Sequence, residues 1–218
     1  MPKSIDAKTQ AVRVVRALTK AYPEAKCALV HRDAFELIVA TILSAQCTDV
    51  RVNIVTRPLF ARFPNAKALA KAEQSEVEDL IRSTGFFRAK AKNLIGMAQA
   101  LVEHHGGKVP ADLDALTALP GVGRKTAHVV LGNAFGIASG IVVDTHVKRL
   151  SYRLGLTKQT DPEKIEHELV AIVPKNQWIN LSHQLIEHGR QVCFARSPKC
   201  GKCPLEEICP KIGVKSAG

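Results

Sequence analysis

The chain has 218 residues, of which 46% are hydrophobic, so it is long enough to bury the core of one large domain or of two small ones. Lys and Arg number 31 against 20 Asp and Glu, and the formal net charge of +11 favours a polyanionic partner, most simply nucleic acid. The sequence has no run of about 18 apolar residues, which argues against a membrane span. Its N-terminus lacks the apolar core that is typical of a signal peptide, so we expect a cytoplasmic protein.

The first half of the chain is predicted to be helical. Residues 6–19 carry apolar side chains at helical spacing. Asp33 is typical of an N-cap and precedes a strongly apolar helix that ends near Leu43. Further along, Ser75 and Glu78 have the spacing of a capping box, which predicts that a helix begins at that serine.

Helices also dominate the second half of the chain. Residues 89–104 form a predicted helix that Gly106 closes, and residues 112–119 form a shorter one. Asp161, followed by proline, indicates another helix start. Only residues 141–143 resemble a strand, and three residues do not make a sheet. The sequence therefore predicts an all-α protein of roughly ten short helices.

A possible phosphate-binding turn, Pro-Gly-Val-Gly, occupies residues 120–123, before a helix that starts near Arg124. Two glycines with one residue between them allow a sharp turn, and their N–H groups beside a helix N-terminus can donate to a phosphate oxygen. This helix-hairpin-helix arrangement reads DNA backbone and not base sequence. An ordinary turn is the alternative, but the flanking Leu-Pro and Arg-Lys-Thr-Ala favour phosphate binding. An aromatic content of only 5% also favours duplex over single-strand binding.

Lys125 lies in the first turn of the helix after this hairpin. The positive end of the helix dipole disfavours an ammonium there, as does the neighbouring Arg124, and partial burial would act in the same direction. These influences would help to supply the neutral amine that attacks an electrophilic carbon. A simple ion pair with a phosphate, the commoner role of a lysine beside DNA, stays open at this point.

Asp144, in Val-Val-Asp-Thr-His, follows an apolar run and precedes a predicted helix. An N-cap is its ordinary role. The carboxylate at the mouth of a helix can also face a pocket, so a chemical role is compatible with capping. In the cleavage of a glycosidic bond, it would stabilise positive charge on the sugar or assist proton transfer from a nucleophile.

Four cysteines lie within seventeen positions near the C-terminus: Cys193, Cys200, Cys203 and Cys209. Structural zinc usually takes two close pairs, whereas this spacing contains only one. Four thiolates also suit a [4Fe–4S] cluster, which the spacing favours modestly over zinc. Disulfides are the weakest interpretation in a cytoplasmic chain.

The loop between the first two of these cysteines carries Arg196 and Lys199 and is a candidate second contact with phosphate. A solvated loop is the alternative. Residues 193–218 hold 5 basic and 2 acidic side chains, and residues 1–26 hold 6 and 2. The two terminal segments therefore supply most of the net positive charge.

Taken together, these residues resemble the endonuclease III family, bifunctional DNA glycosylase/lyases for oxidised pyrimidines, from roughly residue 30 to residue 210. The motifs that carry the resemblance are Ser44-Ala45-Gln46-Cys47-Thr48-Asp49, Leu119-Pro120-Gly121-Val122-Gly123-Arg124-Lys125-Thr126-Ala127, Val143-Asp144-Thr145-His146 and Leu185-x2-His188-Gly189-Arg190. The cysteine spacing is that of the family's [4Fe–4S] cluster, so the resemblance implies this cofactor.

The resemblance implies two all-α domains with a DNA groove between them. A six-helix domain with the hairpin would span residues 27–137, and residues 1–26 would join residues 138–218 in the cluster domain. Lys125 and Asp144 would come from opposite sides of the groove. The implied reaction is base flipping, attack of the Lys125 amine on C1′ with help from Asp144, formation of a Schiff base, and β-elimination. The implied substrate is double-stranded DNA with damaged pyrimidines or abasic sites, bound by a monomer.

The resemblance also implies which residues contact DNA. Gln46 would fill the space left by the flipped base, and Phe86 would wedge into the opposite strand. The remaining expected contacts are Gly121, Val122, Gly123, Thr126, His146, Arg196 and Lys199. Two positions depart from the family pattern: Phe86 stands where Leu is frequent, and Ser197 stands where Lys is frequent. These departures put the opposite-base preference and the individual roles of the loop cations in doubt.

Two other functions are compatible with parts of the sequence. A monofunctional mismatch or adenine glycosylase would share the fold and cluster, but such relatives typically lack a lysine at the position of Lys125. A non-catalytic duplex-DNA-binding protein with a structural metal would need neither Lys125 nor Asp144.

Overall fold

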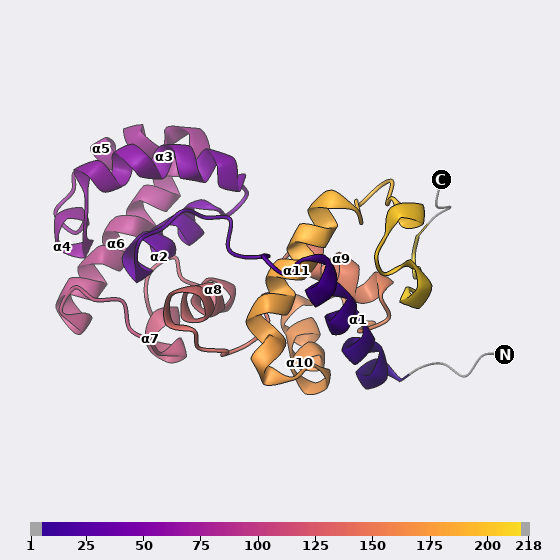
Figure 1. The fold of residues 1–218 in the computed structure, drawn as a ribbon. Helices are drawn as coiled ribbons and strands as arrows, with labels where there is room; N and C mark the ends of the chain where they lie inside the picture. The colour runs from indigo at the N-terminus through magenta and orange to yellow at the C-terminus, as the bar shows by residue number, and fades with distance from the viewer. Residues whose placement is uncertain (1–5, 215–218) are drawn as a thin grey trace. The chain divides into compact units, whose positions relative to one another are not determined.

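The structure, a computed structural model, describes residues 6–214, and these residues form α-helices, short 3₁₀ turns and connecting loops (Figure 1). The expected all-α class is confirmed. Residues 141–143 have irregular backbone, and the N–H of Val142 donates to Oγ of Ser182 at 3.0 Å. No helix among the described residues is long and apolar enough to cross a membrane. Lys3 and Lys215, which contribute to the basic termini, lie outside the described residues.

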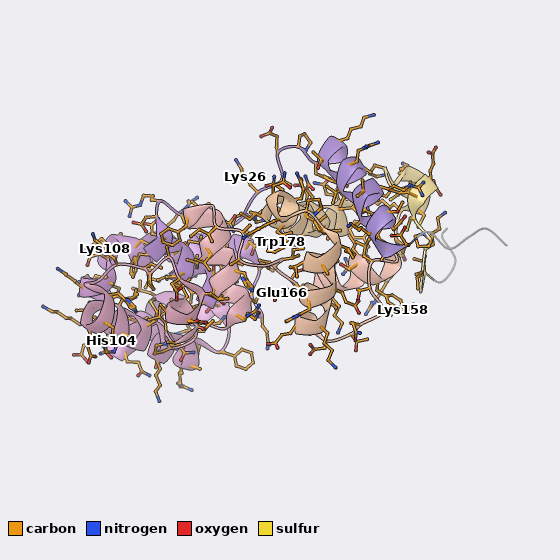
Figure 2. The ribbon with its side chains drawn as sticks, turned by 90° about the horizontal axis from the view of Figure 1, so that it is seen from below. Lys26, His104, Lys108, Lys158, Glu166 and Trp178 are labelled. Atoms are coloured by element: carbon orange, nitrogen blue, oxygen red, sulfur yellow. The ribbon has the colours of Figure 1, made fainter. Side chains whose placement is uncertain are left out.

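The chain divides into two compact units, each with its own hydrophobic core. The first, named here the hairpin unit, comprises Cys27–Ser139. The second, named the cysteine unit, combines the described residues up to Lys26, which is labelled in Figure 2, with those from Gly140 onward. Because the N-terminal helix packs with the C-terminal half of the chain, this unit is discontinuous in sequence.

The hairpin unit is built around a long helix, α6. Its α-helices are α2 (Ala34–Leu43), α3 (Asp49–Arg62), α4 (Ala66–Leu69), α5 (Gln74–Ile81), α6 (Phe87–His105), α7 (Leu113–Thr117) and α8 (Arg124–Phe135), with a 3₁₀ turn, η1 (Arg82–Thr84), before α6. Helix α6 packs against α2, α4 and α5, and α8 packs against α2 and α7. Leu37, Leu94 and Met97 are fully buried between them.

The structure confirms the helix ends that we named for the hairpin unit, with one exception. Asp33 caps α2 and accepts from the N–H of Glu36 at 2.9 Å, and α6 ends at Gly106 with φ +62°. The capping box at Ser75 is wrong, because α5 begins one residue earlier and Ser75 lies inside its first turn. Glu78 accepts instead from the side chain of Gln74.

The cysteine unit packs α11 against both α1 and α9. Its elements are α1 (Ala7–Ala21), α9 (Thr145–Arg153), α10 (Pro162–Ile172), η2 (Lys175–Gln177), α11 (Trp178–Gln191), η3 (Cys200–Lys202) and η4 (Glu206–Ile208). Buried Gln10 on α1 donates to the carbonyls of Leu154 at 3.1 Å and of Ile208 at 2.7 Å. Trp178, labelled in Figure 2, donates its indole N–H to the carbonyl of Val173 at 2.9 Å. Through Gln10, the N-terminal helix α1 is hydrogen-bonded directly to the cysteine region.

Candidate active site and cysteine centre

The Pro-Gly-Val-Gly segment joins α7 to α8 and is seated on α6. Gly121 has φ +75°, a conformation that residues with a Cβ rarely adopt. A Cβ added there would also lie 2.8 Å from Cβ of Asn93 on α6. On the same helix, a Cβ at Gly96 would lie 3.4 Å from the ring of Pro120. The hairpin therefore rests against α6, and glycine is needed at its tip for both backbone conformation and space.

The first turn of α8 offers backbone donors to an anion. Gly123 is its N-cap and has no side chain that could bond the N–H groups of that turn. The first bond of the helical ladder runs from the N–H of Ala127 to the carbonyl of Gly123, so the N–H groups of Lys125 and Thr126 precede that ladder at the open end of the helix. Thr126 lies half-buried in this turn. Such a helix N-terminus favours a phosphate oxygen.

Val122 differs from the other residues of the hairpin. Its side chain is 5% exposed and belongs to the core, and its N–H donates to the carbonyl of Leu119 at 3.1 Å. That N–H closes the turn, and the contact of Val122 with DNA stays a prediction. Its role in this structure is to anchor the hairpin.

Lys125 is the second residue of α8, and its side chain is exposed. Partial burial, which we expected to favour the neutral amine, is therefore not found. Arg124 precedes Lys125 in the same first turn of α8. The amine lies in the first turn of α8 and is accessible from solvent.

Asp144 is the N-cap of α9, as its sequence context predicts. Its Oδ1 accepts from the N–H groups of His146 and Val147, both at 2.8 Å. The residue is half-buried. Because both capping bonds end on the same oxygen, capping does not engage Oδ2, and a second role for the carboxylate is compatible with this geometry.

The start of α9 is held close to α11 at Gly189. A Cβ added to Gly189 would lie 2.7 Å from Nδ1 of His146 and 3.0 Å from Nη2 of Arg149. Nη2 of Arg149 lies 3.1 Å from the same His146 nitrogen and donates to the carbonyl of Gly189. Burial lowers the pKa of His146, the charge of Asp144 opposes this shift, and the Arg149 guanidinium adds to it. Because a guanidinium can only donate, Nδ1 of His146 is the acceptor in its contact with Arg149.

Gln46 and Phe86 occupy two exposed turns of the hairpin unit. Gln46 lies between α2 and α3 with φ +53°, and Phe86 precedes α6 with φ +46°. The Phe86 side chain is 68% exposed, so it does not cover the core. Its neighbour Phe87 packs against the core instead. Both turns present their side chains outward.

The four cysteines, Cys193, Cys200, Cys203 and Cys209, line one cavity that is partly open to solvent. None of the four forms a disulfide. Among residues 6–214, no three His, Cys, Asp or Glu side chains converge on a position for a single metal ion. Tetrahedral zinc would require sulfurs about 2.3 Å from one centre. Four thiols spread around a cavity suit a larger iron–sulfur cluster better than a single zinc ion.

Hydrogen-bond donors lie close to three of the four sulfurs. Nη1 of Arg153 lies 3.3 Å from Sγ of Cys193, and the N–H of Leu205 lies 3.4 Å from Sγ of Cys203. A third sulfur, that of Cys209, accepts from a backbone N–H at 3.4 Å. Burial nevertheless raises the pKa of Cys203 to about 11, so iron must displace protons when it binds.

Arg153 on α9 holds the loop that carries Arg196 and Lys199. The guanidinium of Arg153 donates to the carbonyls of Phe194 and Ala195, both at 2.7 Å. Arg196 and Lys199 are exposed, and the Lys199 ammonium lies 5.1 Å from the centre of the Phe194 ring. The loop thus bonds inward through its carbonyls and presents its cations to solvent.

The supporting roles of three residues were not predicted from the sequence: Gly189, Arg153, and Lys90, whose ammonium donates to the carbonyls of Leu43 and Thr84. A glycine inside an apolar helical pattern, such as Gly189, is a recognised signal of close packing and could have been noticed. Lys90 and Arg153 gave no signal, because a buried cation on a helix has the same sequence context as an exposed one. Their partners are backbone carbonyls that only the fold brings near.

The chain matches two family models. The first, described as HhH-GPD superfamily base excision DNA repair protein, matches residues 39–175. The second, described as the iron–sulfur binding domain of endonuclease III, matches residues 193–209, the segment bounded by the first and last of the four cysteines. The hairpin, Lys125 and Asp144 all lie within the first match.

Characterised relatives and solved structures extend the match to nearly the whole chain. Endonuclease III of Synechocystis sp. is 54% identical over 208 residues, 95% of each chain. That of Escherichia coli K12 is 39% identical over 202 residues, 93% of this chain and 95% of the relative. A non-covalent endonuclease III–DNA complex aligns with a TM-score of 0.90 and 43% identity over 95% of this chain and 97% of that one. A trapped covalent endonuclease III–DNA intermediate aligns with the same values.

Proposed function

The chain belongs to the endonuclease III family and is a bifunctional DNA glycosylase and AP lyase of base excision repair, and we propose that it removes oxidised pyrimidines through Lys125 and Asp144. The observation that carries the proposal is the exposed amine of Lys125 in the first turn of α8, directly after a hairpin shaped for phosphate. A lysine that only paired with phosphate would need no carboxylate partner. A nucleophile needs a group that accepts its proton.

The proposed reaction uses the neutral amine of Lys125 as nucleophile. Its Nζ forms a bond to C1′ as the C1′–base bond breaks and the base leaves. The carboxylate of Asp144 takes a proton from the attacking amine and stabilises positive charge that develops on the sugar. The sugar ring then opens to a protonated Schiff base between Lys125 and C1′.

The same intermediate leads to strand cleavage. Loss of a C2′ proton allows β-elimination, which breaks the C3′–O bond and releases the phosphate 3′ to the lesion. Water then hydrolyses the Schiff base and frees Lys125. All steps use the amine, the carboxylate and water, so no oxidant or reductant is required. Because the two residues belong to different units, the proposal requires that the bound duplex meets both units.

Access to C1′ requires that the damaged nucleotide leaves the helix. We assign the filling of the vacated stack to Gln46 and the opposite-strand wedge to Phe86, the two exposed residues of strained turns. Extrusion costs a few kcal/mol, and least for a damaged base that stacks poorly, which supplies part of the selectivity. The larger ring of Phe86, where the family frequently has Leu, is proposed to affect the choice of opposite base.

The hairpin and the cysteine loop are the proposed phosphate contacts. Gly121, Gly123 and Thr126 surround the N-terminus of α8, and His146 lies near the N-terminus of α9. Arg196 and Lys199 are exposed cations on the cysteine loop, and they compensate for the absence of lysine at Ser197. These contacts read backbone rather than sequence, as a repair enzyme that scans the chromosome in the bacterial cytoplasm requires.

The four cysteines hold a [4Fe–4S] cluster. The cluster supplies structural cross-linking of the cysteine loop when bound, and no proposed step of the reaction passes through it. We expect the purified protein to be yellow-brown with broad visible absorption. A colourless preparation with stoichiometric zinc would contradict this cofactor.

Borohydride trapping tests the proposed function. The wild type is mixed with a duplex that contains thymine glycol, in the presence of borohydride, which reduces the Schiff base to a stable amine. We expect a covalent protein–DNA adduct for the wild type and none for Lys125→Gln, with duplex binding retained in both. A monofunctional glycosylase would release the base without an adduct, and a non-catalytic binder would do neither. Absence of the adduct from the wild type would overturn the proposal.

A further inference from the structure

A buried lysine on α6 connects the two strained turns of the hairpin unit. Lys90 is only 5% exposed. Its Nζ donates to the carbonyl of Leu43 at 2.9 Å and to the carbonyl of Thr84 at 2.8 Å. A single ammonium therefore holds two backbone segments that are far apart in sequence.

Each of these carbonyls lies two or three positions before a residue proposed to enter the DNA. Leu43 is the last residue of α2, and Gln46 follows three positions later. Thr84 is the last residue of η1, and Phe86 follows two positions later. The ammonium thus ties together the starts of the Gln46 turn and the Phe86 turn.

Lys90 is a costly choice for a purely structural position. Burial of an ammonium is unfavourable, and the first turns of α6 place it near the positive end of that helix's own dipole. The carbonyl of Leu43 at the negative end of α2 offsets part of this cost. Burial lowers the pKa of Lys90, and nearby Cys47 opposes the shift. An apolar side chain would fill the same space at lower cost but would not bond either carbonyl.

Helix α6 also supports the third DNA-contacting segment. Asn93, three residues after Lys90, contacts the tip of the hairpin at Gly121, and Gly96, three residues further, lies against Pro120. Residues spaced by three lie on neighbouring positions of one helix face. One face of α6 therefore bears both the ammonium and the seat of the hairpin.

We propose that Lys90 is a positioning residue for base extrusion, whose ammonium fixes the Gln46 turn and the Phe86 turn relative to each other so that both side chains enter the duplex together. The inference rests on the proposed function in one respect, the roles given to Gln46 and Phe86. It adds a residue that does not touch DNA or the reacting atoms and acts through the backbone of the two turns.

Removal of the Lys90 ammonium should slow base extrusion without changing the chemical steps at Lys125. In Lys90→Met the side chain keeps its length but donates no hydrogen bond, while Lys125 and Asp144 are unchanged. Because small misplacements of positioning groups cost large factors in rate, we expect excision of thymine glycol from duplex DNA to fall about 10- to 100-fold. A preformed abasic site has no base to extrude, so trapping there is expected to stay within about threefold of the wild type.

The experiment compares four full-length proteins with the cluster bound: wild type, Lys90→Met, Lys90→Arg and Lys92→Met. Lys92 is an exposed lysine of α6, so its substitution removes the same charge without the carbonyl contacts. Single-turnover excision and borohydride trapping at an abasic site are measured for each protein. Fluorescence of 2-aminopurine beside the lesion reports unstacking directly. Thermal unfolding and visible absorption report folding.

Selective loss of excision and of the 2-aminopurine signal in Lys90→Met, with partial recovery in Lys90→Arg and none of these losses in Lys92→Met, supports the inference. Excision at the wild-type rate in Lys90→Met overturns it, as does an equal fall in excision and abasic-site trapping. If Lys90→Met does not fold, the same comparison in Lys90→Arg decides. Failure of the proposed function is distinguishable, because the wild type itself would then give no adduct.

Discussion

Gln46 and Phe86 share a left-handed backbone, with φ of +53° and +46°, although neither residue is glycine. This conformation costs about 1–2 kcal/mol for a residue with a Cβ. Both side chains are exposed, so burial does not offset that cost. Strain of this kind concentrates at functional sites, where it holds a side chain in a required direction. In this chain both strained turns begin at carbonyls that Lys90 holds.

The strain at Phe86 predicts a separation of stability from activity. In Phe86→Gly the left-handed backbone is relieved, but the unfolded chain gains freedom worth about 0.5–1 kcal/mol. We therefore expect the free energy of unfolding to stay equal or to rise by up to about 1 kcal/mol, while excision falls at least about tenfold for lack of a wedge. Urea unfolding and single-turnover excision measure the two effects. Phe86→Leu is the control and should excise well; wild-type excision by Phe86→Gly would exclude the wedge role.

Substitutions of the two hairpin glycines should affect different properties, stability for Gly121 and DNA affinity for Gly123. Gly121→Ala meets Asn93 at 2.8 Å and requires φ +75°, so we expect it to lower the free energy of unfolding by about 1–3 kcal/mol. A Cβ at Gly123 meets nothing within 4 Å, and its φ of −90° suits any residue. Gly123→Ala should therefore fold almost normally but bind duplex DNA more weakly, because the methyl group lies where a phosphate approaches. Urea unfolding and DNA titration at fixed salt test the pair; unchanged affinity in Gly123→Ala would contradict phosphate binding at this turn.

Two substitutions of Asp144 should differ in stability but not in activity, because the residue both caps α9 and has a proposed chemical role. Asn caps helices about as well as Asp does, so Asp144→Asn should keep the stability of α9 and lose the carboxylate. Asp144→Ala loses both and should unfold about 1 kcal/mol more easily. We expect excision to fall about 10²- to 10⁴-fold in each, the range typical of a lost acid/base group. Thermal unfolding and excision kinetics separate the effects. Near-wild-type excision by Asp144→Asn would leave Asp144 as a cap only.

The sequence predicted those features that depend on local chemistry. Asp33 and Asp144 cap helices because an Asp before an apolar helix accepts from the next free N–H groups, whatever the fold. The cysteine spacing and the Gly-Val-Gly turn are local in the same sense. The role of Lys90 was not predictable, because its two carbonyl partners are brought near only by tertiary packing. The capping box predicted at Ser75 was wrong because a capping pattern does not locate the start of a helix to within one residue.

Arg153 predicts how the cysteine loop and its cluster respond to a conservative change. Its planar guanidinium bonds Sγ of Cys193 and the carbonyls of Phe194 and Ala195 at once, a fork that lysine cannot reproduce. In Arg153→Lys we expect the visible absorption to bleach several-fold faster under an iron chelator, because the loop opens more often. DNA affinity should fall, while trapping at saturating DNA stays near wild type because Lys125 and Asp144 are untouched. Lys148→Met, which removes an exposed cation of the same helix, is the control. Equal bleaching in wild type and Arg153→Lys would mean that the cluster is held by its four thiolates alone.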